Sequence, residues 1–137
     1  MTHDLSRFVT AQADSYADAL AELRDGVKRS HWMWFIFPQI AGLGHSAMAV
    51  RYAVQSLDEA RAYLAHPILG PRLIESSGAV AVASGSAEAI MGDIDAIKLR
   101  SSMTLLAAAA DDPTPFTAVL DRFYNGERDP ATLRLIG

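Results

Sequence analysis

The sequence contains no cysteine, and this absence removes disulfides, zinc sites built on thiolates and a cysteine nucleophile together. The four histidines, His3, His31, His45 and His66, are scattered, and no two of them have the helical spacing of paired metal ligands. The sequence therefore predicts no metal site, and it does not identify a cofactor.

Long apolar runs and basic residues are also scarce. The longest apolar run falls far short of the roughly 18 residues that a transmembrane helix requires. The segment Met1–Asp4 lacks the basic and then apolar layout of a signal peptide, so a cytoplasmic location is expected. Sixteen acidic against twelve basic residues give a net charge of −4, which argues against nucleic acid as a partner. No expected helix has the basic polar face that binds a membrane surface.

The chain is long and apolar enough to build a core. With 137 residues, 50% hydrophobic and 20% charged, it fits one globular domain over residues 1–137. Apolar residues at helical spacing and helix-capping residues recur along the chain, without a repeat or a linker. These patterns predict an all-α, compact, single-domain bundle of about seven short helices around a buried aromatic segment, with room for a small sheet beside that segment.

Single residues predict several helix boundaries. Ser56 and Glu59 form a capping box, in which the hydroxyl accepts from the Glu59 amide and the carboxylate reaches back. Pro71 opens an alanine- and valine-rich segment that Gly78 is expected to break. The longest helix is expected over residues 93–110, with an apolar stripe made of Ile94, Ile97, Met103, Leu106 and Ala110.

Aromatic side chains gather at one place in the sequence. Four of the eleven aromatic residues, including both tryptophans, lie within Trp32–Phe37. Such a cluster anchors a core, lines a pocket or forms an interface. Because successive residues are apolar, the run is expected to be buried on both faces, as an extended connector or a short helix.

The residues around the aromatic run are suited to an anionic ligand. Lys28 could hold a phosphate or a carboxylate, and His31 could transfer a proton. Trp32 or Trp34 could stack on a base or a sugar. The plainer alternative is that the tryptophans fill the core while Lys28 and His31 are ordinary rim residues.

A polar glycine turn follows the aromatic run. Gln39 and His45 flank Gly42-Leu43-Gly44, and glycines let backbone N–H groups approach an anion. Gln39 and His45 are therefore candidate ligand contacts. The alternative is a turn that needs glycine for a positive φ.

A second group of reactive side chains lies on the expected long helix. Asp95, Lys98 and Ser102 share one helical face, at offsets of three and seven, beside Ser101. Asp95 and Lys98 are candidate catalytic residues together with His31, and the two serines are candidate ligand contacts. Alternatively, Asp95 and Lys98 form an ordinary ion pair on a solvated helix face.

Five distinctive motifs are distributed along the chain: Gly26-x-Lys28, His31-Trp32-Met33-Trp34-Phe35-Ile36-Phe37-Pro38-Gln39, Gly42-Leu43-Gly44, His66-Pro67-x-Leu69-Gly70-x-Arg72-Leu73 and Asp95-x-x-Lys98-x-x-Ser101-Ser102-Met103-Thr104-Leu105. In combination they resemble the bacterial domain-of-unknown-function family 1810, from Phe8 to Leu135. The resemblance implies a small all-α protein and supplies no activity or catalytic residue. Members are sometimes labelled calpastatin, but calpastatin segments are disordered, and this chain has the opposite composition.

Two functions of different classes fit these residues. The varied chemistry around the aromatic run favours a pocket for a nucleotide- or sugar-phosphate-like small molecule, and whether it catalyses a reaction stays open. The alternative is a non-catalytic interaction module, most simply a homodimer, with the aromatic run as core and interface.

Overall fold

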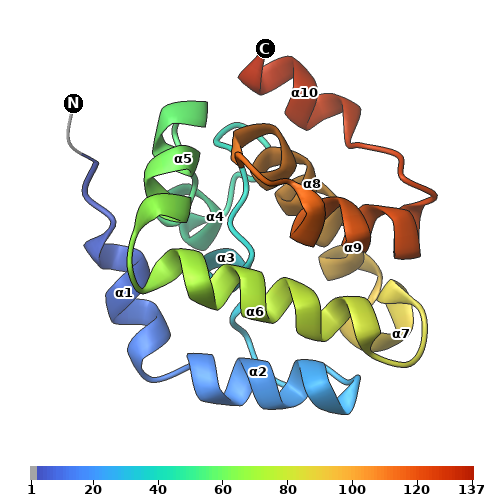
Figure 1. The fold of residues 1–137 in the computed structure, drawn as a ribbon. Helices are drawn as coiled ribbons and strands as arrows, with labels where there is room; N and C mark the ends of the chain where they lie inside the picture. Colours follow the sequence, from blue (N-terminus) through green and yellow to red (C-terminus); the bar gives the residue numbers. More distant parts are fainter. Residues whose placement is uncertain (1–2) are drawn as a thin grey trace.

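A computed structural model describes residues 3–137, and its regular elements in that range are helices and one isolated bridge (Figure 1). The helices in chain order are α1 (Ser6–Ala13), α2 (Tyr16–Asp25), α3 (Met33–Ile36), α4 (Ala47–Arg51), α5 (Leu57–Ala65), α6 (Leu69–Val82), α7 (Ala87–Met91), α8 (Asp93–Ala109), α9 (Thr114–Tyr124) and α10 (Pro130–Ile136). Seven of these helices have seven residues or more, and the all-α prediction is confirmed. No helix within the described range is both long and apolar enough to cross a bilayer.

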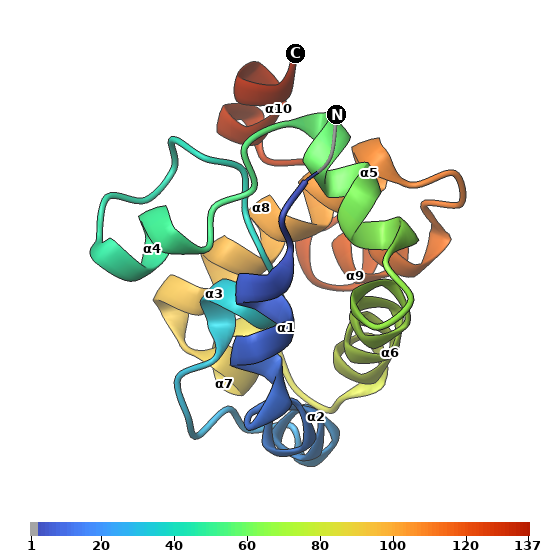
Figure 2. The same cartoon turned by 90° about the vertical axis from the view of Figure 1, so that its left-hand side faces the viewer.

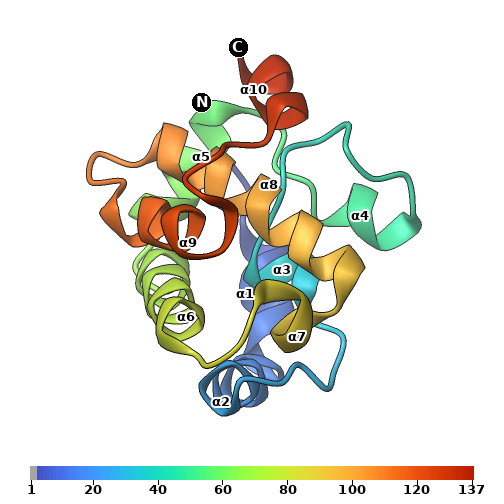
Figure 3. The same ribbon diagram turned by 90° about the vertical axis from the view of Figure 1, so that its right-hand side faces the viewer.

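The longest helix, α8, occupies the centre of the fold. It packs against α5, α7, α9 and α10, and Figure 3 shows it between α9 and α4. All seven residues from Ser101 to Ala107 are buried. This part of α8 is apolar or small on every side, so neighbouring helices can cover it all round.

In the first turns of α8, the structure differs from the expected apolar stripe. Met103 and Leu106 are buried, but Ile94 and Ile97 are 71% and 67% exposed. The prediction was wrong here because the buried face of these turns passes through Ala96, 2% exposed, and Leu99, 0% exposed. Apolar spacing does not show which of two apolar faces the neighbouring helices cover.

Helix α6 also differs from the expectation, because it continues through Gly78 without a break. A Cβ added at Gly78 would meet no atom within 4 Å, so packing does not require this glycine. Gly70 is the glycine that packing requires in this helix, since a Cβ there would clash with the carbonyl oxygen of Leu64. A single interior glycine lowers helix stability modestly, and tertiary contacts override it.

The capping box at the start of α5 is confirmed in one of its two bonds. The Ser56 hydroxyl accepts from the N–H of Glu59 at 3.1 Å. The Glu59 carboxylate, however, accepts from the N–H of Gln55 and from Arg7 Nη2, both at 3.1 Å. The arginine draws the carboxylate toward α1, so the second bond of the box forms one residue earlier than expected.

The aromatic run forms α3, a short buried helix, as one of the two alternatives predicted. Figure 2 shows it beside α1, and Gln12 of α1 donates to the carbonyl oxygen of Phe35 at 2.8 Å. The chain then extends to Ile40, which forms an isolated parallel bridge with Val54. This bridge is the small trace of sheet in the described range, and it fixes the segment that leads into α4.

Candidate functional site

A groove of about 510 Å³ lies where the segment before α4 faces α8 and the start of α10. Figures 2 and 3 show this segment and α4 at the periphery of the molecule, beside α8. One part of its lining is apolar, from Leu43, Ala49, Ile94, Ile97 and Ala131. The other part is polar, from Gln39, His45, Ser46, Lys98, Ser101 and Asp129.

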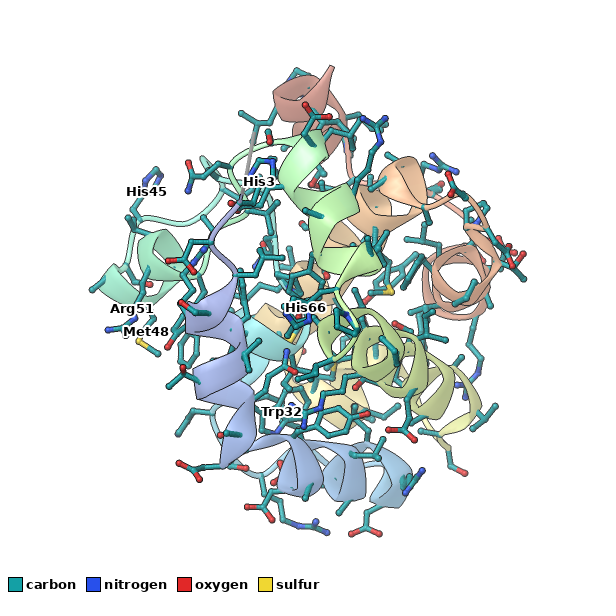
Figure 4. The ribbon with its side chains drawn as sticks, turned by 60° about the vertical axis from the view of Figure 1, so that its left-hand side comes forward. His3, Trp32, His45, Met48, Arg51 and His66 are labelled. Atoms are coloured by element: carbon teal, nitrogen blue, oxygen red, sulfur yellow. The ribbon has the colours of Figure 1, made fainter. Side chains whose placement is uncertain are left out.

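Four residues that the sequence analysis selected line this groove: Gln39, His45, Lys98 and Ser101. Two follow the aromatic run and two belong to α8, so the fold joins the two groups that were found separately. Figure 4 shows His45 pointing away from the body of the molecule, on the segment before α4. His45 is therefore a rim residue, and the other three lie deeper.

Asp95 lies between the two lysines of the chain. Lys28 Nζ is 3.0 Å from Asp95 Oδ2, and Lys98 Nζ is 3.8 Å from Asp95 Oδ1. The Lys28 side chain is 9% exposed and also donates to the carbonyl oxygen of Ser30 at 2.6 Å. The Lys98 side chain is 29% exposed. Lys28 is thus held by groups of the protein, whereas Lys98 presents its charge to the groove.

Trp32 is a core residue, 1% exposed, and Figure 4 shows it inside the fold. Its Nε1 donates to Glu22 at 3.0 Å, and Lys28 Nζ is 5.0 Å from its ring centroid. Glu22 also accepts from the N–H groups of Arg29 and Ser30 and from the Ser30 hydroxyl. Burial raises the pKa of Glu22, but these hydrogen bonds outweigh burial and lower it to about 2. A ligand contact by Trp32 stays a prediction, since its contacts here are with the protein.

Trp34 has a different environment. It is partly exposed, and Lys98 Nζ lies 5.7 Å from its ring centroid. Its Nε1 is buried without a hydrogen-bond partner among residues 3–137. Trp34 also lines a cavity of about 20 Å³ that shares Gln39, Gly44 and Ala49 with the groove. Trp34 therefore lies at the inner side of the groove.

Two other predicted residues are not part of the groove lining. His31 is exposed at the beginning of the aromatic run. Ser102 is fully buried in α8, and its hydroxyl has no hydrogen-bond partner within the described residues. The catalytic role of His31 and the ligand contact of Ser102 stay predictions.

Asp129 supplies the carboxylate of the groove. Its Oδ2 accepts from the Ser101 hydroxyl at 3.2 Å and from the N–H of Thr132 at 3.0 Å, as the N-cap of α10. Its own N–H donates to the Thr104 hydroxyl at 2.9 Å. The Asp129 carboxylate is therefore fixed against α8 by the same bonds that start α10.

Comparison with known proteins gives a family without an activity. Residues 2–136 match the family described as "Protein of unknown function (DUF1810)". The chain belongs to this family. The solved structure titled "Crystal structure of the conserved hypothetical protein Rv1873 from Mycobacterium tuberculosis at 1.38 A" is 53% identical, with a TM-score of 0.95. The match covers 97% of this chain and 96% of that chain. A search of curated proteins found no match.

Ile94, Ile97 and Asp129 are among the groove residues that sequence reasoning on this DUF1810 protein missed. The isoleucines have the spacing of a core stripe, and Asp129-Pro130 has the pattern of a helix start. Their place in one groove depends on how α10 packs on α8, which no local pattern reveals. No group of three histidine, aspartate or glutamate side chains within residues 3–137 is placed to hold a metal ion.

Proposed function

We propose that the groove binds a small phosphorylated molecule of the nucleotide or sugar-phosphate class. One observation carries the proposal. A groove of about 510 Å³ brings together Lys98, whose charge is not needed to compensate Asp95, an apolar wall and several hydrogen-bonding groups. Small-molecule sites are mostly apolar with a few converging polar groups, and their volumes are about 300–1,000 Å³.

The charges around Asp95 support an anion at Lys98. Lys28 lies closer to Asp95, at 3.0 Å, and is more buried, so it compensates that carboxylate. The pair between Lys98 and Asp95 is longer, at 3.8 Å, and partly exposed, where ion pairs contribute little. A phosphate can therefore bind Lys98 without leaving Asp95 unpaired.

The remaining lining suits the rest of such a ligand. Ile94 and Ile97 offer apolar surface to a base or to a sugar ring. Within the described residues, the hydrogen bonds to the Asp129 carboxylate all reach Oδ2. Oδ1 of Asp129 and the amide of Gln39 are therefore suited to sugar hydroxyl groups.

Binding is supported more directly than catalysis. Both carboxylate oxygens of Asp95 are already engaged by ammonium groups of the protein. His31 is exposed and does not line the groove. A catalytic role for His31 or Asp95 requires a substrate that reaches beyond the groove, whereas Lys98 lies within it. Turnover of a bound probe by the wild type is the observation that would support catalysis.

Thermal unfolding with a panel of ligands tests the binding function. The probes are AMP, ribose 5-phosphate and glucose 6-phosphate, added to wild type, Lys98→Met and Arg24→Met. Arg24→Met is the control, because it removes an ion pair of equal length, 3.8 Å, outside the groove. A ligand at a hundred times its Kd adds about 2.7 kcal/mol to the free energy of unfolding.

We expect one or more probes to raise the Tm of wild type and of Arg24→Met, and to leave the Tm of Lys98→Met unchanged. A shift that Lys98→Met retains would place the site elsewhere. The absence of any shift across the panel would contradict the proposed ligand class.

The interaction module is the second candidate, and the exposure of Ile94 and Ile97 favours it. The aromatic run is buried, so it would supply the core, and these isoleucines would supply the contact with a second copy of the chain. Light scattering at high concentration separates the two candidates. A dimer that Ile97→Glu dissociates supports this alternative, and a monomer removes it.

A further inference from the structure

Trp34 has a hydrogen-bond donor that the fold does not use. Its Nε1 is buried and has no acceptor among residues 3–137, whereas Nε1 of Trp32 donates to Glu22 at 3.0 Å. Buried donors in proteins are nearly always paired, because an unpaired one loses its bond to water without a replacement. The two tryptophans therefore differ in one specific atom, and the difference points to an acceptor outside the protein.

A small cavity beside Trp34 matches the size of such an acceptor. Its volume is about 20 Å³. This is room enough for one water-sized oxygen. Three of its lining residues, Gln39, Gly44 and Ala49, also line the groove. The cavity therefore adjoins the groove along a shared wall.

Gly44 is part of that shared wall and packs closely on Ala49. A Cβ added at Gly44 would lie 2.6 Å from the Cβ of Ala49, so one of the two must shift. Since both residues line the cavity, the shift changes its shape while the Trp34 indole is retained. Gly44→Ala is thus a test of the space, and Trp34→Phe is a test of the donor.

We infer that this cavity is an inner subsite of the groove, in which Trp34 Nε1 donates to one uncharged oxygen of the bound ligand. The inference rests on the proposed function, because the same ligand places its phosphate on Lys98. The indole N–H is a neutral donor and no charged side chain among residues 3–137 lines the cavity, so the subsite suits a hydroxyl or carbonyl oxygen and not a phosphate group. In the free protein, a water molecule is the acceptor.

Nuclear magnetic resonance of the two ¹⁵N-labelled indole groups measures this directly. Trp34→Phe assigns the two signals, and the Trp32 signal, whose N–H is bound to Glu22, serves as an internal control for the fold. The probes are ribose 5-phosphate, UMP and inorganic phosphate. All three probes carry a phosphate group. Ribose 5-phosphate adds sugar hydroxyl oxygens, UMP adds sugar hydroxyl oxygens and base carbonyls, and inorganic phosphate has neither.

We expect a nuclear Overhauser contact between the Trp34 N–H and water in the free protein. Ribose 5-phosphate or UMP should replace this contact and shift the Trp34 signal, while the Trp32 signal stays in place. A shift with UMP alone identifies a carbonyl, and a shift with both identifies a sugar hydroxyl. Trp34→Phe and Gly44→Ala should each weaken the binding of that probe by about three- to tenfold, and leave the affinity for inorganic phosphate unchanged.

Three results would overturn the subsite or the proposed function, and they show which of the two has failed. If ribose 5-phosphate or UMP binds through Lys98 but the Trp34 signal does not move, the subsite is wrong and the proposed function stands. If inorganic phosphate moves the Trp34 signal equally, the selection of an uncharged oxygen is wrong. If no probe binds, the proposed ligand class fails. In that case a water contact at Trp34 still supports an acceptor subsite, and its absence overturns it.

Discussion

The two tryptophans of the chain have the same kind of partner and different environments. Lys28 Nζ lies 5.0 Å from the ring centroid of Trp32, and Lys98 Nζ lies 5.7 Å from that of Trp34. Both lysines also reach the carboxylate of Asp95. We refer to Lys28 and Trp32 as the closed pair and to Lys98 and Trp34 as the open pair.

The pairs differ in how their polar atoms are satisfied. In the closed pair, the Trp32 indole donates to Glu22 and the Lys28 ammonium donates to Ser30, with little exposed surface. In the open pair, the indole N–H has no partner within residues 3–137, and the lysine faces the groove. A satisfied group stabilises the fold, whereas an unsatisfied one lowers stability and remains available for a ligand. Aromatic residues two positions apart can thus belong to the core and to the wall of a cavity beside a groove.

Replacing each tryptophan with alanine tests this contrast most strongly. Trp32 is 1% exposed and its N–H is bound to Glu22, so we expect Trp32→Ala to lower the free energy of unfolding by about 3–5 kcal/mol. Trp34 is partly exposed, so Trp34→Ala should have a clearly smaller effect. Urea unfolding measures both values. Equal losses would mean that both tryptophans are core residues and that the distinction is wrong.

Low pH should reduce the stability of the fold by protonating Glu22, the acceptor of the Trp32 indole N–H. Its pKa is about 2 in the folded protein, below the ordinary value of 4.5. Because the folded pKa is the lower one, ionised Glu22 stabilises the fold fully above pH 4.5, and this contribution is lost as the pH falls toward 2. A shift of this size corresponds to about 3 kcal/mol.

Glu22→Gln isolates this contribution from the other carboxylates. The difference in unfolding free energy between wild type and variant should be largest near neutral pH and shrink steadily below about pH 4.5. Glu88→Gln, at an exposed glutamate of α7, is the matched control and should show a difference that does not depend on pH in this way. A pH-independent difference for Glu22→Gln would exclude an ionised, stabilising Glu22.

The fold and the burial of Trp32 follow largely from local patterns. The aromatic run is apolar at successive positions, which predicts burial on both faces. Gly26, with φ of 77°, ends α2, and Ser46 and Asp129 begin helices through bonds to N–H groups three residues ahead. Such residues act on their own backbone, so their effect can be predicted from the sequence.

The open pair depends on contacts between distant segments and could not be predicted. Ile94 and Ile97 have the spacing of a buried stripe, but the neighbouring helices cover the face of Ala96 and Leu99 instead. In the closed pair, the role of Glu22, ten residues before Trp32, could not be predicted either, because a carboxylate on a helix is usually exposed. Its burial is set by four donors that converge only when α2 meets the aromatic run.

Exchange of each lysine for methionine separates the pairs by charge. Lys28→Met leaves Asp95 with only its longer ion pair, so we expect a loss of about 1–3 kcal/mol. Lys98→Met removes a partly exposed pair, so its loss should stay below about 1 kcal/mol. Urea unfolding at low and high salt gives both values, and only the small Lys98 effect should be sensitive to salt. The reverse order would show that Lys98, and not Lys28, compensates Asp95.

The smallest expected effect is the coupling between Lys98 and Trp34. The lysine is partly exposed, and cation–π contacts of this kind contribute about 0.5–1 kcal/mol. A double-mutant cycle of Lys98→Met and Trp34→Leu measures the coupling, and a cycle of Arg24→Met with Trp34→Leu is the control, for which no coupling is expected. A coupling of this size means that the Trp34 ring holds the Lys98 ammonium group only weakly. A ligand can therefore bind this ammonium group. No coupling in either cycle would mean that the Trp34 ring does not position Lys98. The proposed phosphate contact would then lack an ammonium group that is already held at the groove.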